Sequence, residues 1–135
     1  MKQPHALFLF LFFCTQSYSQ KITIDEKVVN GYIETAGEYY ATNEFENSLK
    51  YSKIALQHAL RLKNDYLIAQ SYNSFAVIFD EFGQIDRALY FYEKSLKYAS
   101  KIQNNTLLSW VNNNIGGTYY FNKVNIKKGI KKKKK

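Results

Sequence analysis

The chain has 135 residues, a formal net charge of +8 and a single cysteine, so a fold held together by disulfides is excluded. Eight of the 19 basic residues are lysines from Lys123 onward, and the eleven that remain balance the eleven acidic residues. The body of the chain is therefore neutral. Because no aromatic residues interleave the terminal lysines, a nucleic-acid-binding protein is not expected.

The first nineteen residues have the layout of a secretory signal peptide. Lys2 supplies a positive charge, residues 7–13 are continuously apolar, and Ser17 and Ser19 form a small-x-small cleavage pattern. The apolar run is too short to span a bilayer, which needs about 20 residues. We therefore expect export to the periplasm or to the medium, with membrane contact only if the leader (1–19) is retained.

Two other interpretations of this leader remain open. The apolar run can be a buried first helix, although nothing after it completes an amphipathic pattern. Cys14 can be a lipid-modified residue after signal cleavage, but Phe13 stands where lipoprotein signals have a small residue.

After a short lead-in at 20–28, apolar residues recur at helical spacing, so the predicted fold class is all-α. Gly83 is expected just past the end of a helix, where a left-handed conformation favours glycine. Asp86 is expected in the first turn of the next helix, where the helix dipole favours a negative charge. The predicted helices span 26–41, 44–62, 66–82, 85–102 and 106–122, with a sixth that begins near 125.

The same arrangement of residues recurs every forty positions. Each occurrence has a large or polar residue, an apolar or β-branched one three later, a small one next and an aromatic one three beyond. The occurrences are Tyr32, Thr35, Ala36 and Tyr39, then Tyr72, Phe75, Ala76 and Phe79, then Asn112, Ile115, Gly116 and Tyr119. Self-similarity at such a period is typical of stacked repeats, in which each unit buries its apolar face against its neighbours.

The middle unit resembles the tetratricopeptide repeat, a helix-turn-helix unit. The residues that carry the resemblance are Ala69, Tyr72, Phe75, Ala76, Phe79, Gly83, Ala88, Tyr92, Ser95 and Leu96. The period is longer than the usual length of about 34 residues, and is similar to the longer-helix variety found in bacterial regulators and sensor proteins. The resemblance implies a right-handed superhelical array of antiparallel helix hairpins, an α-solenoid.

The flanking units depart from the pattern, since Asn43 stands where Gly83 does and Asn112 replaces the first aromatic residue. An extra residue around Val124 pushes the next helix out of phase, so the sequence predicts a repeat cut short, as a frameshift or truncated reading frame would leave. The open third repeat then offers a surface for self-association. The expected divisions are a first repeat at 29–66, a second at 67–106, a partial third at 107–130 and a lysine tail at 131–135.

The resemblance also implies where residues pack and where a ligand lies. The residues expected to pack the repeats are Tyr32, Ala36, Tyr39, Tyr72, Phe75, Ala76, Phe79, Gly83, Ala88, Tyr92, Leu96, Ile115, Gly116 and Tyr119. In this family the first helix of each hairpin lines the concave side. The expected peptide-binding groove therefore contains Asn30, Ile33, Tyr40, Gln70, Asn73, Val77, Trp110, Asn113, Asn114 and Tyr120.

Amides dominate this groove, and amide side chains suit hydrogen bonding to the backbone of an extended peptide. Trp110 and Tyr120 are candidates to anchor an apolar side chain. The alternative is that Asn113 and Asn114 are solvated amides and that Trp110 packs on a neighbour. Since the groove has no Lys or Arg, a clamp for a C-terminal carboxylate is not expected.

Residues that carry chemistry are scarce. His58 is the only histidine after the leader, so a metal site is not expected. No nucleophile has a visible base, and Gly116-Gly117 lacks the Lys-Ser/Thr of a phosphate-binding loop. The adjacent carboxylates Asp80 and Glu81 are expected to be solvated. The sequence therefore predicts a protein that is not an enzyme and binds no cofactor.

Two classes of function remain. The first is an exported, non-catalytic scaffold that binds a protein or an extended peptide. The second is the N-terminal periplasmic sensor region of a larger signalling protein, such as a sensor histidine kinase.

Overall fold

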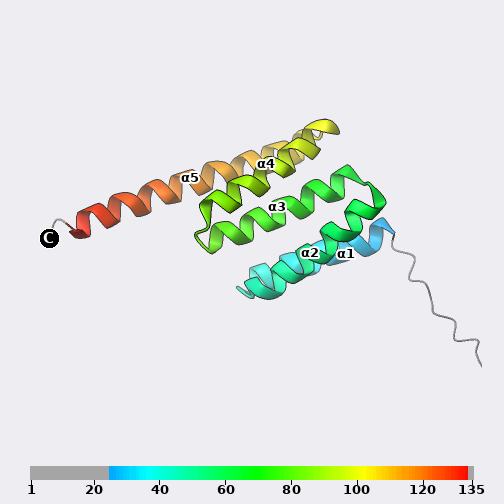
Figure 1. Ribbon diagram of the computed structural model, residues 1–135, viewed down its shortest axis with the longest axis horizontal. Coiled ribbons are helices and arrows are strands. Elements are labelled where there is room, and N and C mark those ends of the chain that lie inside the picture. The colour runs from blue at the N-terminus through cyan, green and yellow to red at the C-terminus, as the bar shows by residue number, and fades with distance from the viewer. Residues whose placement is uncertain (1–24, 134–135) are drawn as a thin grey trace, which may run out of the picture.

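The computed structural model describes residues 25–133, which form five α-helices joined by short turns (Figure 1). The first four helices begin and end within one residue of the predicted bounds, so the all-α class is confirmed. The expected leader at 1–19, most of the lead-in at 20–28 and the last two lysines lie outside the described residues. The helices are α1 (Glu26–Ala41), α2 (Phe45–Leu62), α3 (Asp65–Glu81), α4 (Ile85–Lys101) and α5 (Asn105–Lys133).

The four turns repeat one backbone geometry at intervals of twenty residues. In the third turn, the N–H of Gly83 bonds to the carbonyl of Asp80 at 2.8 Å, and the N–H of Gln84 bonds to that of Phe79 at 2.9 Å. This pair of bonds closes the C-terminus of a helix in a Schellman motif. The role expected for Gly83 is confirmed, although other residues adopt the same conformation elsewhere. The residues with positive φ are Asn43 (61°), Lys63 (54°), Gly83 (69°) and Gln103 (53°).

The long helix α5 corrects the sequence prediction, because it continues to Lys133 instead of ending near 122. In each of the four turns the residue after the positive-φ position has a side-chain oxygen, and two of these side chains, Asn64 and Asn104, accept a bond from the new helix. The corresponding position twenty residues after Asn104 is Val124, which has no such oxygen. Lysine is also a good helix former. The chain continues here as one helix, so the predictions of an end near 122 and of a sixth helix from about 125 are wrong.

The forty-residue recurrence of the sequence is also a recurrence of packing. Residues 41–64 and 81–104 are buried, half-buried and exposed at the same positions throughout. The fully buried positions are Ser48, Ser52, Ala55 and Ala59 in α2 and Ala88, Tyr92, Ser95 and Ala99 in α4. The two hairpins thus use the same helix faces, and every one of these positions except Tyr92 carries a small side chain.

Stacked rings between the two helices of each hairpin repeat in the same way. Tyr51 of α2 stacks on Tyr39 of α1 with ring centroids 5.4 Å apart, and Phe91 of α4 stacks on Phe79 of α3 at 5.4 Å. Tyr32–Tyr51, a tilted pair at 6.3 Å, corresponds to the stacked pair Tyr72–Phe91 at 6.2 Å. The stacked pairs Tyr32–His58 at 5.7 Å and Tyr72–Tyr98 at 5.9 Å also correspond. Aromatic residues therefore set the spacing within both hairpins.

Most of the expected packing residues lie in the interior. Ala36, Phe75, Ala76, Phe79, Ala88 and Tyr92 are buried, and Tyr32, Tyr39, Tyr72, Leu96 and Ile115 are half-buried. Gly83, Gly116 and Tyr119 differ from the expectation, because all three are exposed. Gly83 lies in a turn, and within the described residues α5 contacts only α3 and α4, so a Cβ built on Gly116 meets no atom within 4 Å.

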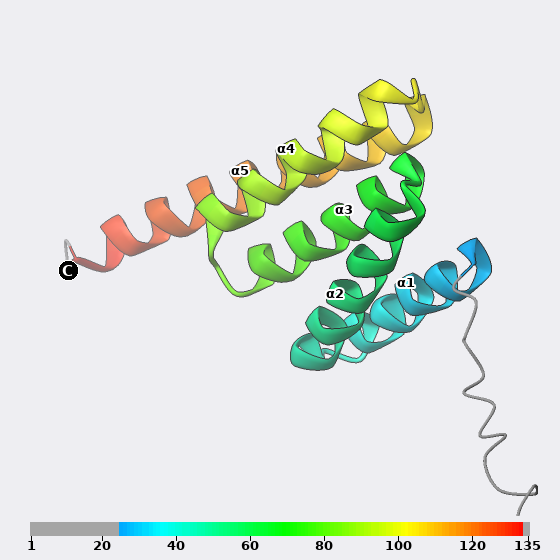
Figure 2. The ribbon, with the colours of Figure 1, turned by 45° about the vertical axis from the view of Figure 1, so that its right-hand side comes forward.

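Each helix packs mainly on its neighbours in sequence (Figures 1 and 2). Two further contacts join helices that are not consecutive: α1 meets α3, and α3 meets α5. Within the described part of the chain, α2 and α4 make no corresponding contact. The odd-numbered helices therefore approach one another on one side of the molecule. The C-terminal part of α5, drawn orange to red, projects beyond α3 and α4.

Candidate functional site

The side on which α1, α3 and α5 meet is the candidate site, and we call it the odd-helix face. Hydrogen bonds between side chains cross it at three points. The Tyr40 hydroxyl donates to Glu81 Oε1 at 2.7 Å, which joins α1 to α3. Between α3 and α5, the bonds are Thr118 Oγ1 to Asp80 Oδ2 at 2.6 Å and Asn114 Nδ2 to Asn73 Oδ1 at 3.1 Å.

Asp80 and Glu81 therefore have a structural role that the sequence did not indicate. They are adjacent in α3, yet Glu81 accepts a bond from α1 and Asp80 accepts one from α5. The expectation of a solvated carboxylate holds for Glu81, which is exposed, and fails for Asp80, which is half-buried. Consecutive helix positions point in different directions, and here each direction also meets a neighbouring helix.

Tyrosine hydroxyls beside this face are held in the protonated form. Burial, together with the hydrogen bond to Glu81, raises the pKa of Tyr40 well above its usual value. Burial also raises the pKa of Tyr92 to about 12. The Tyr40 hydroxyl is thus a donor to Glu81 throughout the physiological pH range, and its lone pairs remain able to accept from a ligand N–H.

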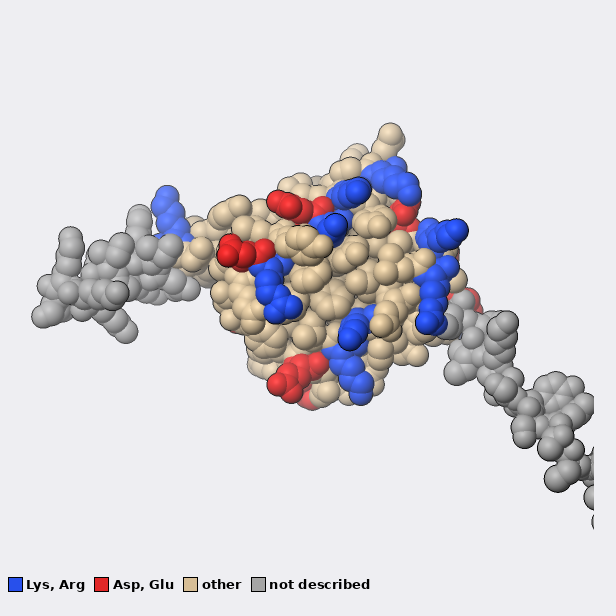
Figure 3. Space-filling view, viewed as in Figure 1, with Lys and Arg blue, Asp and Glu red and all other residues tan. Residues whose placement is uncertain are grey.

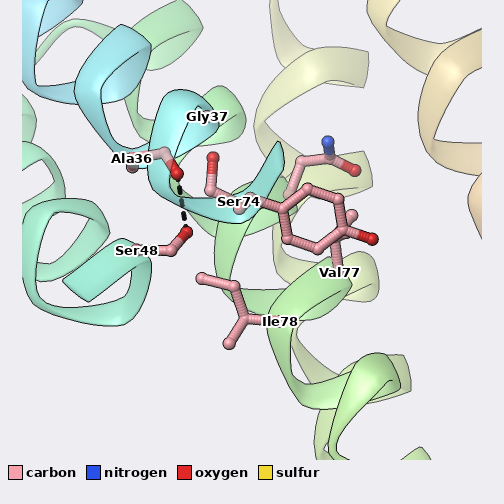
Figure 4. Close-up of a pocket in the computed structure, with 8 residues that line it drawn as sticks. Ala36, Gly37, Ser48, Ser74, Val77 and Ile78 are labelled. Carbon is pink, nitrogen blue, oxygen red and sulfur yellow. Dashed lines mark hydrogen bonds between the residues drawn. The ribbon is translucent and has the colours of Figure 1, made fainter. Parts of the chain in front are cut away.

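A cavity of about 130 Å³ lies between α1 and α3, with one residue of α2 at its base (Figure 4). Its floor is formed by Ala36, Ser48 and Ile78, which are all buried. The Ser48 hydroxyl donates to the Ala36 carbonyl at 2.7 Å, so the floor has no unused hydroxyl donor. The rim consists of the exposed Gly37 and the half-buried Tyr40, Asn73, Ser74 and Val77. We call this space the α1–α3 cavity.

A second cavity, of about 480 Å³, lies where the end of α3 and the following turn face α5. Asp80, Glu81 and Thr118 line it together with Phe121 and Asn122. Its carboxylates already accept bonds from Thr118 and Tyr40. This second cavity is wider and more acidic than the α1–α3 cavity.

The structure gathers only some of the residues expected in the groove. Tyr40, Asn73 and Val77 line the α1–α3 cavity, and Asn114 bonds to Asn73. Ile33 packs against the core formed by α1, α2 and α3. Trp110, Asn113 and Tyr120 are exposed on α5, with 54% of Trp110 and 66% of Tyr120 accessible to solvent.

The two remaining groove residues, Asn30 and Gln70, are half-buried. Gln70 donates from Nε2 to the Tyr66 hydroxyl at 3.1 Å, while its buried Oε1 has no partner among the described residues. The expected groove is therefore divided: its α1 and α3 residues surround a cavity, and its α5 residues lie on open surface.

Charge is distributed unequally between the helices. In α1, α3 and the part of α5 up to Asn122, six acidic residues accompany a single basic one, Lys27. In α2 and α4, seven basic residues accompany three acidic ones. Figure 3 shows basic and acidic side chains interspersed over one face rather than gathered into one patch. Around the α1–α3 cavity, the lining residues include no Lys or Arg, in keeping with the expected groove, so this part of the odd-helix face offers no cationic partner to an anion.

Sequence reasoning missed Gly37, Ser74, Glu81 and Thr118 as residues of this face. Thr118 had a signal, because it occupies the position of the buried Ile78 one repeat earlier, and a hydroxyl there needs a partner. Gly37 had a weaker signal, as a glycine in the middle of a predicted helix. Nothing in the sequence distinguished Ser74 from a solvated serine.

Between residues 25 and 133, no helix combines the length and apolar character needed to cross a bilayer, and no group of His, Cys, Asp and Glu could hold a metal ion. Comparisons with protein families, with curated proteins and with solved structures found no match to this chain.

Proposed function

We propose that this protein is a non-catalytic scaffold of the tetratricopeptide-repeat type, which is exported from the cytoplasm and binds a protein segment or an extended peptide on its odd-helix face. The single observation that carries the proposal is the contact of α1 with α3 and of α3 with α5. These contacts make one continuous face from helices that are separated in sequence.

The repeat character of the fold supports an α-solenoid. Residues 41–64 and 81–104 share their burial pattern, and the ring stacks of the two hairpins agree to within 0.2 Å. Units that repeat their packing are added by the same rotation and translation, which generates a superhelix and a concave surface. The proposed array is right-handed, as in the family that the sequence resembles.

The chemistry of the face supports a peptide ligand. Asn73 uses its carbonyl oxygen to accept from Asn114, so the amino group of Asn73 is left to other partners. Tyr40 is oriented by Glu81 beside the same cavity. Directional donors and acceptors beside an apolar recess are what an extended peptide requires, because its backbone needs hydrogen bonds and its side chains need pockets.

Selection from random peptides displayed on phage, with the full chain immobilised, tests this function. The proposal expects enrichment of peptides that bind the wild-type chain. Val77→Lys, which brings a charge to the cavity rim, should abolish that binding, whereas Gln57→Lys on the exposed side of α2 should not. Thermal melts of both variants show whether they remain folded. Failure of the wild-type chain to enrich any peptide would contradict the proposal.

The export part of the proposal rests on the leader at 1–19 and has a separate test. Expression in a Gram-negative host followed by mass spectrometry should find a mature chain that begins at Gln20 in the periplasmic fraction. A soluble cytosolic protein that retains Met1 would contradict export without affecting the binding face.

A further inference from the structure

The floor of the α1–α3 cavity selects for an apolar occupant. The side chains of Ala36 and Ile78 consist of carbon atoms only, and 1% of each residue is accessible to solvent. Ser48 is equally buried, and its hydroxyl is already bonded to the Ala36 carbonyl. A polar group placed against this floor would lose its hydrogen bonds to water without replacing them. An aliphatic group makes no hydrogen bonds to water, so it has none to lose there.

The volume of the cavity restricts the size of that occupant. A dry cavity of about 150 Å³ in another protein takes benzene. The α1–α3 cavity, at about 130 Å³, is slightly smaller. A branched side chain of three or four carbons fits this space, whereas an indole ring does not.

Gly37 keeps the rim of the cavity open. It lies inside α1, where glycine is less favourable than alanine by about 1 kcal/mol. A Cβ built on Gly37 has no atom within 4 Å, and Gly37 is not among the residues with positive φ, so neither a close contact nor a turn requires a glycine here. A larger side chain at this position would occupy the mouth of the cavity.

The corresponding contact between α3 and α5 is arranged differently. Val77 takes the position of Gly37 one repeat later, and two hydrogen bonds, from Asn114 to Asn73 and from Thr118 to Asp80, cross between the helices. The two contacts are therefore not equivalent, and the recess between α1 and α3 is a property of this chain's own residues.

We propose that the α1–α3 cavity is a specificity pocket for a Val, Leu or Ile side chain of a peptide that has no acidic residue beside it. The inference rests on the proposed peptide-binding function. The apolar floor and the volume determine the aliphatic side chain. Glu81, bonded to Tyr40 at the rim, together with the absence of Lys and Arg among the lining residues, disfavours a neighbouring acid.

The test compares three forms of the full chain in the same phage selection: wild type, Gly37→Leu and Gly31→Leu. Gly31 is the matched control, because it also lies in α1 and also has open space around a built Cβ, but it does not line the cavity. Wild type and Gly31→Leu should enrich peptides with Val, Leu or Ile at one fixed position and without Asp or Glu next to it. Gly37→Leu should lose this preference.

A synthetic peptide from the wild-type selection then provides the affinities by calorimetry. Gly37→Leu should weaken its binding about tenfold or more, and so should replacement of the aliphatic residue of the peptide by alanine, because each removes several buried carbons from the complex. Both protein variants should melt no lower than wild type, since they replace a helix glycine; Gly37→Ala serves as a milder variant if Gly37→Leu melts lower.

The outcomes separate this inference from the function on which it rests. Absence of any enriched peptide contradicts the proposed function. Enriched peptides that share no aliphatic position, or that bind Gly37→Leu as tightly as wild type, contradict the specificity pocket and leave the binding face intact. Enriched peptides with an acidic residue beside the aliphatic one contradict the charge part of the inference.

Discussion

Asn114 of α5 donates a hydrogen bond to Asn73 of α3 across 41 positions of sequence, and Tyr40 of α1 donates to Glu81 of α3 across the same separation. Both bonds join odd-numbered helices. A separation of one repeat plus one residue means that side chains at equivalent positions of two repeats do not face each other. In these two bonds the partner is displaced by one position along the next odd helix, whereas Thr118 and Asp80 are separated by 38 residues.

Replacement of Asn73 by alanine should therefore affect stability. Asn73→Ala removes the bond from Asn114, and loss of a neutral hydrogen bond should lower the free energy of unfolding by about 0.5–1.5 kcal/mol. Asn113→Ala is the control, because Asn113 is exposed and should change stability by less than about 0.5 kcal/mol. Urea denaturation measures both, and a larger effect at Asn113 would contradict the observed pairing.

Ala76 should not tolerate a larger side chain. It is fully buried where α3 meets α4, so Ala76→Leu forces extra carbons into a close contact. The change should lower the free energy of unfolding by about 1–3 kcal/mol. Ala41, at the exposed end of α1, should accept the same change with little effect. If thermal melts find the two variants equally stable, the packing of the second hairpin is different from that described.

Replacement of two glycines by alanine should change the free energy of unfolding in opposite directions. Gly83 has a φ of 69°, so Gly83→Ala strains the turn and should lower the free energy of unfolding by about 1–2 kcal/mol. Gly116 is an exposed position within α5, and a Cβ built on it has open space around it. Gly116→Ala should therefore raise the free energy of unfolding by up to about 1 kcal/mol. Differential scanning calorimetry of both variants tests this contrast, which a shift of the same sign would contradict.

Alkaline pH should destabilise the fold through Tyr92. Burial raises the pKa of Tyr92 from 10.0 to about 12, so the unfolded chain loses this proton before the folded chain does. The stability contributed by the neutral hydroxyl is complete below pH 10 and is lost as the pH rises towards 12. Tyr92→Phe should reduce the decline without removing it, because burial also raises the pKa of Tyr40 and Tyr72. Chemical denaturation between pH 8 and pH 12 measures the free energy of unfolding of both proteins. Its decline should begin near pH 10, which is the ordinary pKa of tyrosine in an unfolded chain.

The exposed aromatic side chains of α5 should drive self-association. Tyr119, Tyr120 and Phe121 are 57%, 66% and 65% accessible and are consecutive in the chain. Analytical ultracentrifugation should find association that increases with concentration and that decreases in Tyr120→Ser/Phe121→Ser. Tyr90→Ser, at an exposed tyrosine of α4, is the control and should leave association unchanged. A monomer at all concentrations would contradict this prediction.

Local signals were enough to predict the first four helices. Helix ends are indicated by Gly83 and by the polar residue at the end of each turn. A close contact between helices is indicated by the small residues Ala76 and Ala88. These features depend on a few residues near one another in the chain. They could therefore be read from the sequence, as could the forty-residue recurrence of the packing.

The length of α5 is the point at which the repeat pattern failed as a guide. The recurrence predicted a turn near 122–125, but α5 continues to Lys133. A turn needs its own stabilising groups at its own position, and a repeat elsewhere in the chain does not provide them.

Only the tertiary structure decided which side chains share the odd-helix face. Successive residues of a helix are rotated by about 100°, so a small change in how α5 packs on α3 decides whether Asn113 or Asn114 reaches Asn73. The α1–α3 cavity depends on the same packing, because its floor and rim come from three helices. The sequence determined the helices and the faces that each must bury, whereas their relative rotation, which is a property of all the contacts together, created the cavity and the bonds around it.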